Sequence, residues 1–105
     1  MDYNEAWKLI RTDKMATDPF VRLTILSYQL EGLGKATFYR YYYNDPVYRK
    51  EQEIAISDLI AQIHLFCLLE GFDFRKLEEL GYKRIMETIN TRLGERKWKK
   101  RFSHL

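Results

Sequence analysis

Residues 17–46, TDPFVRLTILSYQLEGLGKATFYRYYYNDP, decide the fold, because this stretch carries the start and stop signals of one long helix. Asp18 can accept hydrogen bonds from the first free amides, and Pro19 suits the first helical position, which needs no amide hydrogen. The NDP at 44–46 ends the helix, since a residue before proline avoids the helical conformation. Between these signals, leucines spaced by three and four residues predict one buried face: Leu23, Leu26, Leu30 and Leu33.

Two more helices are predicted beside this one. A short helix over 4–13 would be capped by Asn4. A third helix over 47–70 would stop at Gly71, which tolerates a left-handed backbone. Its apolar spacing predicts these inward residues: Ile56, Leu59, Ile60, Ile63, Phe66 and Cys67.

A fourth helix is predicted from Phe74 to about Leu93, with Asp73 as its cap and Gly94 introducing a basic tail over 94–105. The connection at 71–73 is very short, so we expect the third and fourth helices to pack antiparallel. The expected fold is all-α: a small antiparallel bundle of about four helices, in one domain over 1–105.

The composition agrees with a helical globular protein. The chain has 105 residues, of which 46% are hydrophobic and 31% charged, with only 5 Gly and 2 Pro. No apolar run approaches the roughly 20 residues of a membrane helix, and residues 1–14 lack a signal-peptide pattern. We therefore expect a cytoplasmic protein with no membrane partner.

Two residues with reactive side chains are interpreted as structural. Cys67 is the only cysteine, which excludes an internal disulfide or a thiolate zinc site, and its apolar neighbours favour burial. His64 is a lone imidazole in an apolar helix, which is typical of a core or interface histidine.

The third helix is apolar over more than one stripe, since Ile54 and Leu65 lie outside the predicted inward set. A small bundle buries limited surface in one chain, so we expect a homo-oligomer, either a dimer or a tetramer.

The segment EIAISDLIAQIHLFCLLEGFDFRKL at 53–77 resembles the MazG-like all-α nucleoside triphosphate pyrophosphohydrolases. In that family an aspartate opens an apolar helix that ends at a glycine and is followed by an aspartate-capped helix, as Asp58, Gly71 and Asp73 do here. The upstream QLEGLGKA at 29–36 looks like the family's acidic helix in its leucine spacing. The resemblance covers roughly residues 18–93.

The resemblance implies two helices whose carboxylates hold a Mg²⁺ cluster, and a bound nucleoside triphosphate that is split to the monophosphate and pyrophosphate. Carboxylates at i, i+3 and i+4 share one helical face, and Mg²⁺ prefers oxygen ligands in octahedral array. Such ions polarise the phosphate and activate water.

The sequence departs from this pattern at most of its acids. The family's E-E-x-x-E falls on Tyr28, Gln29 and Gly32, and its E-x-x-D falls on Ala55 and Asp58. We therefore assign no catalytic residue on the basis of the resemblance.

The candidate metal ligands that remain are Asp58, Glu31 and Glu51. The leucine register turns Glu31 obliquely or outward, and Glu51 lies about 10 Å from Asp58 along the helix axis. Two interpretations of Asp58 stay open, a vestigial ligand or a polar contact between helices. Mg²⁺ is expected only if the chain is an active enzyme.

Gly32 and Gly34 indicate that something approaches the second helix closely, either a neighbouring helix or a ligand or bulky side chain. The run FYRYYYN at 38–44 places aromatic rings around the helix. Exposed aromatics there favour subunit contact over stacking on a base.

The basicity of the chain is concentrated near its end. Residues 92–101, RLGERKWKKR, hold six basic residues against Glu95, a net charge of 6 − 1 = +5, so the rest of the chain carries 3 − 5 = −2. Lys97, Trp98, Lys100 and Arg101 are candidate contacts to the phosphates and base of a nucleotide or a nucleic acid. The alternative is a solvated extension with Trp98 docked on the bundle.

Three hypotheses of function follow. The first is a MazG-like fold whose lost acids leave a non-catalytic or altered protein that acts in nucleotide binding, assembly or regulation. The second is an active Mg²⁺-dependent pyrophosphohydrolase. The third is a basic helical adaptor for nucleic acid, which depends on the tail alone.

Overall fold

A computed structural model describes the backbone of residues 2–102 and the side chains of residues 2–95. Over that range the chain is helical, with no strand, and its helices are α1 (Tyr3–Ile10), α2 (Pro19–Tyr43), α3 (Val47–Glu70) and α4 (Phe74–Phe102). The predicted all-α fold is confirmed. The contacts divide the chain into two compact units, Met1–Phe72 and Asp73–Leu105.

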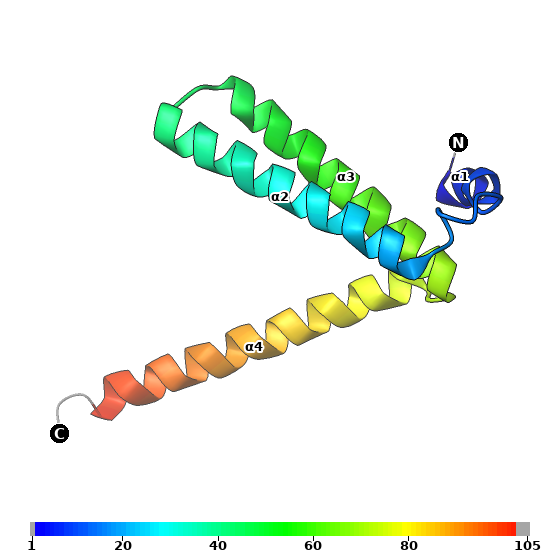
Figure 1. Cartoon of the computed structure of the whole chain (residues 1–105). Helices are drawn as coiled ribbons and strands as arrows, with labels where there is room; N and C mark the ends of the chain where they lie inside the picture. Colours follow the sequence, from blue (N-terminus) through cyan, green and yellow to red (C-terminus); the bar gives the residue numbers. More distant parts are fainter. Residues whose placement is uncertain (1, 103–105) are drawn as a thin grey trace. The chain divides into compact units, whose positions relative to one another are not determined.

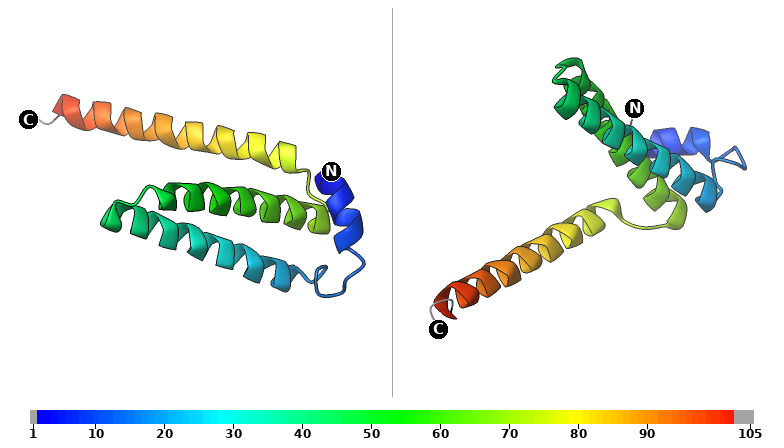
Figure 2. Two further views of the ribbon diagram at one scale, coloured as in Figure 1. Left: turned by 90° about the horizontal axis from the view of Figure 1, so that it is seen from above. Right: turned by 60° about the vertical axis from the view of Figure 1, so that its left-hand side comes forward.

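The first unit is a helical hairpin with a short helix against it. Helices α2 and α3 lie side by side and run antiparallel (Figure 1). Both views in Figure 2 show the same pairing. Helix α1 contacts α3, where the ring of Tyr3 lies 4.3 Å from that of His64. The hairpin therefore holds most of the tertiary contacts of this unit.

The ends of the hairpin helices follow the predicted signals. The Asp18 carboxylate accepts from the amides of Phe20 and Val21 and caps α2. Asn44 ends α2 in the left-handed conformation, and Gly71 ends α3 with a φ of 76°. A left-handed residue satisfies the last carbonyls of a helix at little cost when it is glycine.

Two other boundaries differ from the prediction. Helix α1 is capped by Asp2, which accepts from the Glu5 amide, and not by Asn4. Helix α4 is capped by Asp73 as expected, but it continues through Gly94 to Phe102. Glycine in a helix interior costs only about 1 kcal/mol, and the flanking Arg, Lys and Glu are good helix formers. Gly94 is therefore not a stop signal.

The contact between α2 and α3 follows a heptad spacing, which we call the seam. On α2 it holds residues spaced by four and three, all buried or half-buried: Arg22, Leu26, Gln29, Leu33, Ala36 and Arg40. On α3 the spacing is the same: Tyr48, Gln52, Ala55, Leu59, Gln62 and Phe66. This pattern is that of a two-stranded antiparallel coiled coil.

Only two of the four leucines that were predicted to form a buried face on α2 lie in the seam. Leu26 and Leu33 are in the seam, but Leu23 and Leu30 are 45% and 58% exposed. On α3, Leu59, Phe66 and Cys67 are inward as expected, whereas the predicted inward isoleucines are exposed: Ile56, Ile60 and Ile63. Polar and small residues occupy seam positions, so a search for apolar spacing alone selected the neighbouring stripe.

The second unit is α4, whose first turn is held by Asp73. Its carboxylate accepts from the Arg75 and Lys76 amides at 3.1 and 3.3 Å. The apolar side chains along its described part are exposed, among them Leu77, Ile85 and Ile89. The antiparallel packing of α3 with α4, and the single domain, stay predictions.

By length and composition, α3 could also cross a membrane, although core helices of soluble proteins meet the same criteria. The sequence-based statement that no apolar run approaches this length was too strict, because α3 is apolar enough on average despite polar residues such as Asp58, Gln62 and His64. Cytoplasmic localisation stays a prediction.

Replacing Gly32 tests the helix assignment. A Cβ built at Gly32 meets nothing within 4 Å, so Gly32→Ala is expected to raise the free energy of unfolding by about 0.5–1 kcal/mol in urea titrations. Gly71→Ala is the matched control and should lower it, because its φ of 76° disfavours a side chain. A loss of stability in Gly32→Ala would show that another segment approaches α2 there.

Candidate functional site

Long polar side chains cross-link the seam near the start of α2. The Arg22 guanidinium donates from its Nη2 to Oε1 of Gln62 on α3. Arg22 is only 6% exposed, and its Nε has no hydrogen-bond partner among the described residues. No described carboxylate forms an ion pair with it. A buried charge that meets a single neutral acceptor is costly, so Gln62 is essential to this arrangement.

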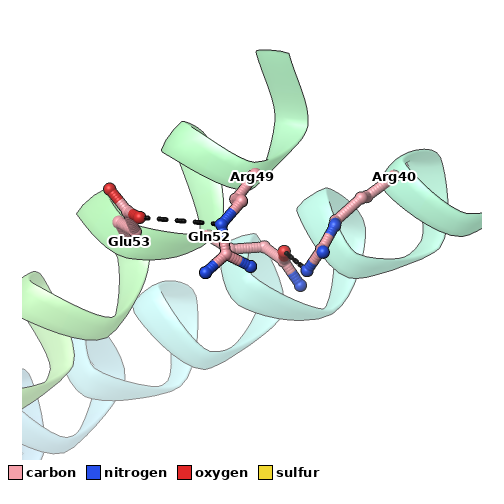
Figure 3. A network of polar contacts seen from close by, with 4 residues as sticks. All are labelled: Arg40, Arg49, Gln52 and Glu53. Carbon is pink, nitrogen blue, oxygen red and sulfur yellow. Dashed lines mark hydrogen bonds and ion pairs between the residues drawn. The ribbon is translucent and has the colours of Figure 1, made fainter. Parts of the chain in front are cut away.

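A second polar layer lies near the turn between the helices. Gln52 Oε1 accepts from Nη1 of Arg40 at 2.8 Å, and Gln52 Nε2 donates to Oγ1 of Thr37 at 2.9 Å. Figure 3 shows the bond of Gln52 with Arg40 beside the ion pair of Arg49 with Glu53, at 3.9 Å. That ion pair is exposed and contributes little. The side-chain amide of Gln52 uses both its oxygen and its nitrogen in bonds to α2. Because both bonds must form at once, this layer specifies the register of α2 on α3.

The two sides of the hairpin differ in character. Residues one position after the seam lie about 100° further round each helix, and in antiparallel helices this rotation brings both sets to the same side. We call this side the lateral face. It comprises the exposed Leu23, Ser27, Leu30 and Gly34 of α2, and Ile56, Ile60 and Ile63 of α3; nearer the turn the same rows carry Tyr41, Arg49 and Glu53.

The opposite face is formed by residues one position before the seam. It carries Tyr28, Gly32 and Lys35 of α2 with Glu51 and Asp58 of α3. Asp58 is half-buried, whereas Glu51 is exposed. Glu51 and Asp58 therefore lie on the same side of the hairpin as Tyr28 and Gly32, two positions where the MazG-like pattern has acids.

Glu31 does not belong to that side. It is exposed and lines a surface hollow of about 450 Å³ on α2 with Phe20, Leu23, Thr24, Ser27 and Tyr28. No group of three or more His, Cys, Asp or Glu side chains that could hold a metal occurs in the described part of the chain. Glu31, Glu51 and Asp58 are thus not brought together as one cluster, and a metal role for any of them stays a prediction.

Cys67 is buried, as expected. Burial raises the pKa of its thiol, since desolvation disfavours the thiolate. A raised pKa and a closed surface give an unreactive cysteine, which agrees with the structural interpretation. The imidazole of His64 contacts the ring of Tyr3, so it helps to join α1 to α3.

The aromatic run on α2 makes contacts within the chain. Phe38 stacks on Tyr42 with ring centres 4.3 Å apart, and Tyr39 contacts Tyr43 and Tyr48 at 5.5 and 5.3 Å. Tyr41, Tyr42 and Tyr43 remain exposed. Subunit contact through these rings stays a prediction.

Neither Gly32 nor Gly34 is approached within the described chain, because a Cβ at either position would meet nothing within 4 Å. The expected close neighbour is therefore not a described part of this chain.

The basic segment is helical in its backbone up to Phe102. The side chains of Lys97, Trp98, Lys100 and Arg101 lie outside the described residues, and their assignment to nucleotide or nucleic-acid contacts stays a prediction.

Sequence reasoning missed the polar residues of the seam, Arg22, Gln52 and Gln62. The signal that could have found them is the unbroken spacing of four and three residues on both helices once Ala, Gln and Arg are allowed at seam positions.

The comparisons with known proteins give no match. No family model, no curated protein and no solved structure matches this chain.

A paired set of variants tests the Arg22–Gln62 contact. Gln62→Leu is expected to lower the free energy of unfolding by about 1–3 kcal/mol, because it leaves a buried guanidinium without its acceptor. The double variant Arg22→Met with Gln62→Leu should recover most of that loss, since no buried charge remains. Urea titrations of the two single variants and the double variant measure this; simple additivity of the losses would contradict a direct contact.

Thiol labelling tests the environment of Cys67. The native protein is expected to react with a thiol reagent at least about tenfold more slowly than the urea-unfolded chain, because the raised pKa and burial both lower thiolate access. The native rate should keep rising with pH beyond the ordinary thiol range, since the pKa is shifted upward. Equal rates for native and unfolded chains would contradict this placement.

Proposed function

We propose that this chain is a non-catalytic helical assembly protein that works as a homo-oligomer. The observation that carries the proposal is the lateral face, where large apolar side chains of two helices are exposed on one side: Leu23, Leu30, Ile56, Ile60 and Ile63. Contiguous apolar surface of this kind is typical of protein interaction sites.

The small core of the hairpin supports the same proposal. The buried hydrophobic residues of the described chain are Ala36, Ala55, Leu65 and Cys67, of which only Leu65 is large. A pair of helices with so little buried apolar volume gains much of its stability from further burial. Association supplies that burial and couples folding to assembly.

Two positions of the acidic pattern serve packing in this chain, which supports the non-catalytic part of the proposal. Gln29 and Ala55 are seam residues, and Ala55 is buried. An acid at a buried seam position would need a partner to offset its desolvation. The side chains found there suit close contact between helices and not metal binding.

The MazG-like ancestry stays a hypothesis drawn from the resemblance alone. The same holds for its nucleotide-binding and pyrophosphohydrolase alternatives and for the nucleic-acid adaptor. Of these hypotheses, the pyrophosphohydrolase is the one that a single activity assay distinguishes most clearly from the proposed assembly protein.

Two measurements on the full chain test the proposal. Sedimentation equilibrium at micromolar concentration is expected to give a mass above that of one chain, because the lateral face is buried between copies. Incubation with a panel of nucleoside triphosphates and Mg²⁺ or Mn²⁺ is expected to release no pyrophosphate above the buffer blank.

Asp58→Ala is the control for the second measurement and should change nothing. Turnover that Asp58→Ala abolishes would establish the enzyme in place of our proposal, and a strict monomer at every concentration would remove self-association.

A further inference from the structure

We propose that the lateral face of the α2–α3 hairpin is the interface of a two-fold dimer, in which a second copy of this chain covers it to form a four-helix bundle. This inference rests on the proposed self-association and deepens it by assigning the surface and its occupant. It places the primary contact on the lateral face and not on the tyrosine run, the opposite face or α4.

The geometry of the face suits a bundle. Its α2 and α3 residues sit one position after the seam and keep the same spacing of four and three: 23, 27, 30 and 34 on α2, and 56, 60 and 63 on α3. A second hairpin can therefore insert its side chains between these rows, as helices do in bundles. The rows of the two helices lie on one side, so one partner hairpin contacts both.

The charges of the hairpin favour a copy of the same chain over a charged partner. The lateral face carries no charged side chain over 23–34 of α2 and 56–63 of α3; Arg49 and Glu53, which pair with each other, lie at its end near the turn. A two-fold axis brings each surface against itself, so a charged face would meet its own charge. The opposite face carries Lys35, Glu51 and Asp58 and would have to desolvate them.

The size of the face matches what a dimer needs. Helix α3 has 24 residues and is about 36 Å long, and two helices side by side are about 20 Å wide. One whole side of the hairpin is therefore about 700 Å² in projection, close to the roughly 800 Å² that each partner buries in a standard interface, and the apolar rows occupy its middle. A dimer of standard size would therefore cover this whole side of the hairpin, including Arg49 and Glu53 near the turn.

Small residues give the close approach that a bundle requires. Ser27 and Gly34 alternate with Leu23 and Leu30 along the α2 row, and a Cβ at Gly34 would meet nothing within 4 Å. A glycine that costs helix stability without contacting its own chain is explained if the second copy lies against it. The Ile56 and Ile60 side chains of the other copy are the natural occupants of these gaps.

A matched pair of variants on α3 tests the assignment in the full chain. Ile60 and Ile54 have similar exposure, 47% and 52%, but lie on the lateral and opposite faces. Ile60→Glu is expected to raise the dimer dissociation constant at least about 100-fold, because each dimer would bury the charge twice. Ile54→Glu should leave it within a few-fold of the parent. Sedimentation measures the constant, and circular dichroism checks that both variants keep the parent's helicity.

An independent readout uses disulfide cross-linking in a Cys67→Ala background. Leu30→Cys lies midway along the lateral face and should form a covalent dimer on oxidation, whereas the control Tyr28→Cys on the opposite face should not. Both positions are exposed, so neither substitution disturbs the hairpin core.

The outcomes separate this inference from the proposed function. If the parent is oligomeric but only Ile85→Glu on α4 dissociates it, the lateral face is not the interface, while self-association stands. If the parent is a monomer, both proposals fail. In that case, loss of thermal stability in Ile60→Glu would show that another part of the same chain covers the face, and binding of the parent to phosphatidylcholine vesicles would identify lipid as its occupant.

Discussion

The register of α2 against α3 is the constraint on which the rest of the structure depends. It is held by two polar layers, Arg22 with Gln62 at one end and Gln52 with Arg40 and Thr37 at the other. Between them Ala36 and Ala55 are buried, and small side chains at a helix contact let the backbones come close. A slip of one residue would rotate the seam by about 100° and break both layers at once.

This register also determines what each side of the hairpin presents to its surroundings. Because the seam uses arginine, glutamine and alanine at many positions, the large aliphatic residues that would ordinarily form a core lie beside it. The same rotation that puts Gln29 and Ala55 into the seam puts Leu30 and Ile60 on the lateral face. The polar contact between α2 and α3 and the apolar face outside it thus both result from the same register. Together they favour a protein whose folding is completed by association.

The chemistry of the MazG-like pattern depends on the same register. Tyr28 and Gly32 share the opposite face with Asp58, whereas Glu31 is turned toward a hollow elsewhere on α2. An acid can serve a metal cluster only if the helix face that carries it meets the other ligands. The position of Glu31 follows from burial of Leu26, Leu33 and Ala36, so packing and not local sequence decides which acids can meet.

The sequence by itself determined the helices and most of their ends, because Asp18, Gly71 and Asp73 act through local hydrogen bonds and backbone conformation that need no tertiary partner. The sequence also predicted an antiparallel pair from the short connection at 71–73, but for α3 with α4, whereas the pairing that the structure shows is that of α2 with α3. It did not determine which face of each helix is buried, since the leucine spacing of α2 supports two stripes that differ by one position. Only the tertiary structure decided between them, because long-range contacts such as Arg22 with Gln62 join residues 40 positions apart.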